Sequence, residues 1–210
     1  YESDKQQAWN EGTGLVSSIV LSICWYNHRG RAGIHRISIR RLTNRGCGAG
    51  QFWRPVSGGG LSPVKVILNP IAGRGYGSRI EPELRQILSD EGLQYDLEKT
   101  SYAGHAIELA AEAVQSGFKT VVAAGGDGTA NEVVNGLMSA AHNGCVGTLG
   151  LLPVGSGSDF ANNVGVPRGL REACRVLADG RTRLVDICRV LVSGQAPRYF
   201  DNTVNVGFGG

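Results

Sequence analysis

The sequence predicts an α/β fold with a doubly wound, mostly parallel sheet, and three observations support this. From Pro63 onward, short apolar runs alternate with amphipathic segments, Gly-rich loops follow the ends of the apolar runs, and glycine accounts for 32 of the 210 residues. Alternating strands and helices form parallel sheets that helices cover on both faces. Glycine suits the tight strand-to-helix turns because it adopts backbone conformations that other residues avoid.

The predicted elements follow one another in a regular order. The run "VKVILNP" predicts a strand at 64–70, and a helix follows at 78–92, where Ser78 and Glu81 have the spacing of a capping box and Gly92 ends the helix. The next predicted elements are a strand at 93–100, a helix at 104–117, a strand at 119–126, a helix at 129–140, a strand at 147–156 and a helix at 168–180. Segments 183–192 and 198–209 are predicted to be consecutive strands.

The first 62 residues differ in composition from the rest of the chain. They hold 8 Lys or Arg against 3 Asp or Glu, a net charge of +5, whereas residues 63–210 hold 13 against 15, a net charge of −2. We therefore expect residues 1–62 to be an atypical, basic and weakly ordered N-terminal extension, in which segment 34–42 could form a strand without a partner. The Arg-rich segment 29–54 has the charge to bind anionic lipid or nucleic acid.

Several classes of protein are disfavoured by the sequence. The apolar run at 14–26 is shorter than the roughly 20 residues that cross a bilayer, and the chain opens without the basic start of a signal peptide. The five Cys residues are scattered and form no Cys-x-x-Cys pair. This pattern indicates reduced thiols in a cytoplasmic protein rather than disulfide bonds or a zinc site.

Three polar, Gly-rich loops follow predicted strands, at 69–77, 125–129 and 155–158. Ligands of parallel sheets bind outside the carboxyl ends of the strands, so we expect these loops to converge on one edge of the sheet. Glycine lets the backbone approach a phosphate closely, and the N-terminus of the following helix offers free N–H groups. The sequence therefore predicts a phosphate site at this edge.

Asp127 is the informative residue of "GGDGT". It would repel a bare phosphate, so its presence indicates either a Mg²⁺ ion beside the phosphates or a proton to be taken from a hydroxyl. The alternative is an Asp that bonds its own turn. Thr129 could cap the following helix and donate to a phosphate oxygen. The loop at 69–77 lacks the Gly-Lys-Ser/Thr ending of a Walker A motif.

Together these motifs resemble the catalytic domain of the diacylglycerol kinase family, whose bacterial-type members are similar to sphingosine and ceramide kinases and more distantly to NAD kinases. The resemblance covers about residues 63–210. It rests on "NPIAGRG", "KTSYAGHAIELA", "GGDGTANEVVNGL", "LGLLPVGSGSDFANNVGVP", "VDICRV" and "NVGFGG". The family fold is a nucleotide domain of the ATP-NAD kinase-like type, which we expect at residues 63–182.

The resemblance implies a kinase that uses ATP and Mg²⁺ to phosphorylate a lipid hydroxyl, such as that of diacylglycerol. It implies that Asp127 contacts the metal and the phosphates as a catalytic residue, and that Asp159 lies near the substrate hydroxyl or the nucleotide. The residues that would bind ATP are Asn69, Pro70, Gly73, Thr100, Gly125, Gly126, Asp127, Gly128, Thr129, Asn131 and Ser156. Ser156 and Ser158 stand where the family usually has Thr and Asn.

The resemblance also implies a β-rich, lipid-binding second domain, of which residues 183–210 would be the incomplete start. The late acidic base of the family has no counterpart in this chain. The expected partners are ATP and a lipid substrate at a membrane surface, without nucleic acid, and a homodimer stays open. The expected location is cytoplasmic, with peripheral attachment to the inner face of the membrane. The alternatives are an NAD kinase-like or other GGDGT-type kinase and a non-catalytic nucleotide-binding fragment.

Overall fold

The chain is described here by a computed structural model. It describes residues 62–140, 147–180, 182, 185–191 and 195–202, together with the backbone of two strands near the N-terminus. The chain divides into two compact units, one of residues 1–42 and 188–198 and one of residues 43–187 and 199–210, and each is described by itself. Apart from those two strands, residues 1–61 lie outside the described residues, and so does the prediction that this extension is weakly ordered. The "NVGFGG" motif also lies outside the described residues.

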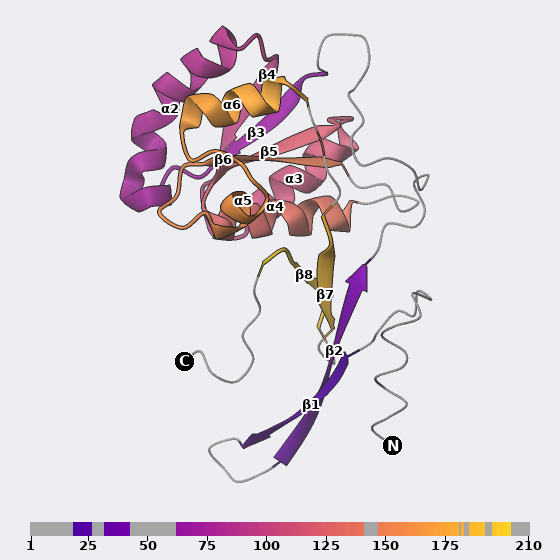
Figure 1. Ribbon diagram of the computed structural model, residues 1–210. Coiled ribbons are helices and arrows are strands. Elements are labelled where there is room, and N and C mark those ends of the chain that lie inside the picture. Colours follow the sequence, from indigo (N-terminus) through magenta and orange to yellow (C-terminus); the bar gives the residue numbers. More distant parts are fainter. Residues whose placement is uncertain are drawn as a thin grey trace, which may run out of the picture. The chain divides into compact units, whose positions relative to one another are not determined.

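The second unit contains a four-stranded parallel sheet (Figure 1). In spatial order its strands are β4 (Tyr95–Lys99), β3 (Val64–Leu68), β5 (Thr120–Gly125) and β6 (Thr148–Pro153). All three pairings are parallel. The chain builds the sheet outward from β3 first to one side and then to the other, so a topological switch point lies between β3 and β5.

Helices cover both faces of this sheet, which confirms the predicted doubly wound α/β class (Figure 1). One face carries α2 (Ala72–Asp90) and α6 (Leu170–Ala178), and the other carries α3 (His105–Gln115), α4 (Asp127–Ser139) and α5 (Asp159–Asn163). Side chains of β3 alternate between the two cores, because Val66 and Leu68 belong to the first and Ile67 to the second. Strands buried on both faces are mostly apolar, and in β3 Lys65 is the exception.

The range of α2 joins two helical stretches across residues 73–75, whose backbone dihedral angles lie in the left-handed region. The continuous helix therefore follows Gly75, close to the predicted start at residue 78. Arg74, with a φ of 59°, is the non-glycine residue of the described chain that has a positive φ. Such a conformation costs about 1 kcal/mol or more and is often found in functional loops.

The predicted capping box at Ser78 is wrong. The hydroxyl of Ser78 donates to the carbonyl oxygen of Pro70 (3.2 Å), so it fastens the helix to the loop after β3. Glu81 forms an ion pair with Arg85 one turn along the helix instead of bonding back to Ser78. The predicted end of the helix is correct, because Gly92 follows the last turn with a φ of 71°.

The first unit contains an antiparallel pair of strands, β1 (Ile19–Tyr26) and β2 (Ala32–Leu42). The expectation that segment 34–42 lacks a partner is therefore wrong, since Ile19 pairs with Ile39 and Tyr26 with Ala32. Of the two consecutive strands predicted after residue 182, the first is present as β7 (Ile187–Leu191). Among the described residues, the second is present only at its start, as β8 (Arg198–Phe200), because residues 201 and 202 form a bend. Both strands belong to the same sheet, in the order β1-β2-β7-β8.

Lys65 is a charged residue buried within the parallel sheet. It lies on β3 with 8% of its surface exposed, and its ammonium nitrogen is 2.7 Å from a carboxylate oxygen of Asp96 and 2.7 Å from one of Glu98, both on β4. Burial lowers the pKa of Lys65, but hydrogen bonds to the two carboxylates outweigh burial, so the pKa is raised above 10.5. The ion pair thus keeps Lys65 charged beneath the edge strand.

We expect an asymmetric loss of stability when this ion pair is broken from one side or the other. Lys65→Met removes the ammonium from Asp96 and Glu98, whose side chains are 56% and 45% exposed and can be hydrated by water. This variant should therefore lower the free energy of unfolding by at most about 1 kcal/mol. The double variant Asp96→Asn/Glu98→Gln leaves a buried ammonium without a counter-charge and should cost about 3 kcal/mol. Urea unfolding at pH 7 measures both.

The same ion pair has a pH dependence with a defined sign. The pKa of Lys65 is higher in the folded chain than its ordinary value of 10.5, so its stabilising contribution is complete below pH 10.5 and is lost as the pH rises through the folded pKa. The stability gap between wild type and Lys65→Met should therefore narrow above that pH. Equal losses for the two kinds of variant at pH 7, or a gap that widens with pH, would contradict this assignment.

Candidate nucleotide-binding site

A pocket of about 510 Å³ lies at the carboxyl ends of the strands, on both sides of the switch point between β3 and β5. All three predicted Gly-rich loops contribute to it, so their predicted convergence is correct. Its volume is within the range of small-molecule sites. Nine of the predicted site residues line it: Asn69, Pro70, Gly73, Thr100, Gly126, Asp127, Gly128, Thr129 and Ser156.

Asn69 joins the loop after β3 to the start of α4. Its backbone N–H donates to the carbonyl of Ala124 on β5 (2.9 Å), and its side-chain amide donates to Oγ1 of Thr129 (3.0 Å). Thr129 is 4% exposed and lies in the first turn, while Gly126 occupies the N-cap position, so the predicted capping role of Thr129 is wrong. Because Oγ1 accepts from Asn69, its own proton stays available for a phosphate oxygen.

The backbone around the N-terminus of α4 forms a close-fitting cradle. A Cβ atom on Gly155 would lie 2.5 Å from Cα of Gly126, so the loops after β5 and β6 can approach only without side chains there. Gly128 faces open space, with nothing within 4 Å of a Cβ position. The N–H groups of Gly128 and Thr129 lie in the first helical turn, where no intrahelical acceptor reaches them. Free N–H groups at the positive end of a helix dipole fit a phosphate.

Asp127 connects the loop after β5 to the loop after β6. Its Oδ1 accepts the backbone N–H of Phe160 (2.9 Å) and its Oδ2 accepts that of Asp159 (3.1 Å), at the start of α5. The alternative of an Asp that bonds its own turn is therefore wrong, because these partners are 32 and 33 residues away. Two charge-assisted hydrogen bonds offset part of the negative charge, which lets a carboxylate lie beside a phosphate site.

Three predicted residues do not line the pocket. Gly125 lies beneath it, and its carbonyl accepts the N–H groups of Val154 and Gly155 (3.0 Å each). Asn131 is one turn further along α4 than Asp127 and faces another segment. The side chain of Asp159 is exposed, and the N-cap residue of α5 is Ser158. The carboxylate of Asp127 accepts the first N–H groups of α5.

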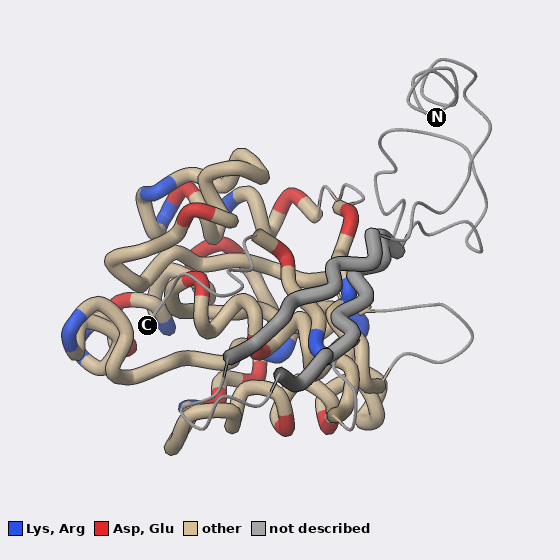
Figure 2. Tube along the Cα trace, turned by 90° about the horizontal axis from the view of Figure 1, so that it is seen from below, with Lys and Arg blue, Asp and Glu red and all other residues tan. Residues whose placement is uncertain are grey.

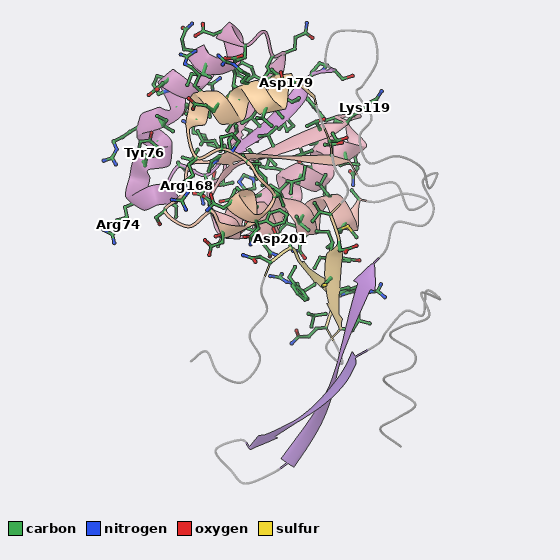
Figure 3. The ribbon with its side chains drawn as sticks, in the orientation of Figure 1. Arg74, Tyr76, Lys119, Arg168, Asp179 and Asp201 are labelled. Carbon is green, nitrogen blue, oxygen red and sulfur yellow. The ribbon has the colours of Figure 1, made fainter. Side chains whose placement is uncertain are left out.

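Two Asn residues of α4 hold the segment after β7. Asn135 donates to the carbonyl of Tyr199 (2.9 Å) and accepts its N–H (3.0 Å), and Asn131 also donates to that carbonyl (3.1 Å). Asp201 then lies beside α4 (Figure 3). The pKa of its carboxyl is raised, mainly by burial and further by the charge of Asp127, although the hydrogen bond from Asn131 acts in the opposite direction. In the sequence, the i, i+4 spacing of Asn131 and Asn135 already indicates that both side chains lie on one face of α4.

Glu132 is a residue of the site that the sequence reasoning missed. From α4 its carboxylate accepts the N–H groups of Gly104 (2.9 Å) and Ala106 (3.3 Å), which caps the N-terminus of α3. Gly104, at the N-cap position of α3, has no side chain that could cap the helix. This glycine was the signal in the sequence that the cap must come from another segment. His105 accepts the Ser101 N–H through Nδ1 (3.1 Å) and so has a local structural role.

The described residues offer a limited set of metal ligands. They contain no group of three or more His, Cys, Asp or Glu side chains that could hold a metal ion. Mg²⁺ commonly binds through one or two carboxylates together with substrate phosphates and water. The donor set here, Asp127 beside a phosphate cradle, fits a Mg²⁺ ion that arrives with a nucleotide better than a metal held by protein alone.

The described surface carries both signs of charge. Figure 2 shows Lys and Arg residues interspersed with Asp and Glu residues along the described trace. Surface ion pairs such as Arg171–Asp90 (3.5 Å) and Arg175–Glu91 (3.6 Å) join α6 to the end of α2. Among the described helices, none is long and apolar enough to cross a membrane.

Comparisons with known proteins agree with this geometry. A diacylglycerol kinase from Bacillus subtilis is 37% identical over 151 residues, which cover 71% of this chain and 46% of that protein. A protein named "Probable lipid kinase YegS-like" from Klebsiella pneumoniae is 41% identical over 113 residues, 52% of this chain and 37% of that protein. The chain thus spans less than half the length of these curated relatives.

A solved structure and a family model extend the comparison. The crystal structure of a diacylglycerol kinase from Bacillus anthracis matches with a TM-score of 0.53 and 28% sequence identity, over 60% of this chain and 44% of that one. The family model described as "Diacylglycerol kinase catalytic domain" matches residues 63–190. These are the residues that form the parallel sheet and its pocket, and the chain belongs to the diacylglycerol kinase catalytic domain family.

Proposed function

We propose that this chain carries the nucleotide-binding part of an ATP-dependent lipid kinase, which transfers the γ-phosphoryl group to a lipid hydroxyl such as that of diacylglycerol. The observation that supports this most is the 510 Å³ pocket at the switch point, lined by the GGDGT loop and by two more Gly-rich loops. In this proposal residues 63–182 form the nucleotide domain, residues 183–210 begin a β-rich lipid-binding domain, and residues 1–62 are an extension. The protein would work in the cytoplasm, at the inner face of the membrane.

The contacts of the pocket give each residue a role in this proposal. The N–H groups of Gly128 and Thr129, with the Thr129 hydroxyl, would donate to phosphate oxygens. Asp127 would hold Mg²⁺ jointly with those phosphates, and the ion would neutralise the charge that develops on the transferred group. Asp159 is the first residue of α5, where its backbone N–H bonds to Asp127, and its side chain would face the acceptor hydroxyl. Catalysis would come mainly from positioning and charge neutralisation.

Gly128→Ala tests the phosphate cradle. The new methyl group meets no protein atom within 4 Å, so the variant should be as stable as wild type or more stable by up to about 1 kcal/mol, because alanine favours a helix. The same methyl group would stand where the phosphates approach the backbone, so ATP affinity should fall at least tenfold. Calorimetric titration with Mg·ATP, together with thermal unfolding, measures both. A variant that binds ATP as tightly as wild type would contradict the cradle.

The acceptor is tested with the protein that contains this chain. Radiolabelled ATP is supplied with mixed micelles of diacylglycerol, with NAD, or with no acceptor. Label in phosphatidic acid is the expected result. Label in NADP instead would favour the NAD kinase-like alternative, and ATP binding without transfer to either acceptor would favour a non-catalytic nucleotide-binding protein.

A further inference from the structure

Two exposed apolar side chains lie in the pocket, outside the phosphate cradle. The large hydrophobic side chains that stay exposed among the described residues are Ile71, Tyr76, Tyr102 and Val185. Two of these four line the 510 Å³ pocket: Ile71, 78% exposed, and Tyr102, 55% exposed. Exposed apolar surface that gathers in a cavity is typical of a ligand contact, because folding alone would bury it.

Tyr102 is held in a fixed orientation. Its ring stacks on His105, with 4.5 Å between ring centroids and 19° between the ring planes. Its hydroxyl donates to Oε2 of Glu108 (2.6 Å), and the Ser101 N–H fixes His105 in turn. The hydrogen bond to the Glu108 carboxylate raises the pKa of Tyr102, so the phenol stays neutral. The ring is therefore a rigid, uncharged platform with one face supported by His105.

The position of this platform in the sheet fits a nucleobase. Tyr102 follows β4, whereas the phosphate cradle follows β5, and β3 lies between them. Neighbouring strands are about 4.8 Å apart, so the two loops are separated by roughly 10 Å. That separation suits the distance between the phosphates and the base of one nucleotide. Ile71 lines the same pocket from the loop after β3, the strand between β4 and β5.

We propose that Tyr102 is the stacking platform for the base of the bound nucleotide, with Ile71 as a second apolar contact. The inference rests on the nucleotide-binding function proposed above and adds the residue that holds the base. Stacking on an aromatic ring tolerates any base, because every base has a π-face. Tyr102 therefore contributes to the affinity for ATP and for GTP alike, and contributes nothing to the affinity for inorganic tripolyphosphate.

The test compares ATP with inorganic tripolyphosphate in calorimetric titrations of the chain. Tyr102→Ala should weaken ATP binding by about tenfold and leave tripolyphosphate binding unchanged. Tyr102→Phe keeps the ring and should bind ATP within about twofold of wild type. Tyr76→Ala is the matched control, because Tyr76 is also exposed (41%) but does not line the pocket and lies on the outer side of α2 (Figure 3). It should change neither affinity.

Each other outcome has a distinct meaning. If Tyr102→Ala binds ATP as tightly as wild type, or loses tripolyphosphate binding to the same extent as ATP binding, the stacking role is wrong while the nucleotide site stands. If wild type binds ATP no more tightly than tripolyphosphate, the base makes no contact and the inference fails alone. If wild type binds neither compound, the proposed function fails, and the inference fails with it.

Discussion

Asp127→Asn is expected to lower both the stability of the fold and its affinity for ATP. The carboxylate accepts two backbone N–H groups at the start of α5, from Asp159 and Phe160. An amide offers one oxygen, and its NH₂ group would face the second N–H, so one donor loses its partner. Hydrogen bonds to charged groups contribute about 1.5–3 kcal/mol, so we expect the free energy of unfolding to fall by about 2 kcal/mol. The start of α5 would be held less firmly against Asp127, and ATP affinity should fall at least tenfold.

Asp159→Asn is the matched control for this effect on stability. The side chain of Asp159 is exposed and only its backbone N–H bonds to Asp127, so its replacement should change the free energy of unfolding by less than about 0.5 kcal/mol. Urea unfolding of the two variants, each with and without Mg·ATP, gives the comparison. If both variants unfolded at the same urea concentration as wild type, the carboxylate of Asp127 would not stabilise the start of α5.

Gly136→Ala is expected to destabilise the chain more than any other exchange of glycine for alanine in α4. A Cβ atom at Gly136 would lie 2.3 Å from the carbonyl oxygen of Ile107 and 2.6 Å from Cβ of Ala110. Both atoms belong to α3, and neither can move by a change of rotamer. Overpacking of this kind costs about 1–3 kcal/mol, and here it should exceed the helix-propensity gain of about 1 kcal/mol. We expect a net loss of about 2 kcal/mol.

Gly128→Ala provides the comparison on the same helix. Its methyl group meets open space, so the two variants gain the same helix propensity and differ only in the close approach of α3 to α4. Thermal unfolding should therefore place Gly136→Ala below wild type and Gly128→Ala at or above it. The same order should not hold for ATP binding, where Gly128→Ala is the weaker binder. If Gly136→Ala were as stable as Gly128→Ala, α3 and α4 could move apart without loss of stability, and the close packing at Gly136 would not contribute to the free energy of unfolding.

The sequence was sufficient to predict the fold class and the convergence of the three Gly-rich loops. The periods of apolar residues are local properties, so the strands at 64–68 and 120–125 could be identified from their own residues. Parallel pairing then brings the carboxyl ends of the strands to one edge, which made the position of the pocket predictable before any contact was known. The family resemblance, carried by "GGDGTANEVVNG", depended on the same local segments.

The tertiary structure decided which groups join those segments. Asp127 bonds to residues 32 and 33 positions away, Glu132 caps a helix from 26 and 28 positions away, and Asn135 holds Tyr199 from 64 positions away. The errors at Ser78 and Thr129 have the same origin, because both hydroxyls fit a local cap but bond to the loop after β3 instead. A hydrogen bond depends on distance in space and not along the chain. The sequence therefore determined the elements and the edge where they meet, and only the packing of the sheet decided the partners of each side chain.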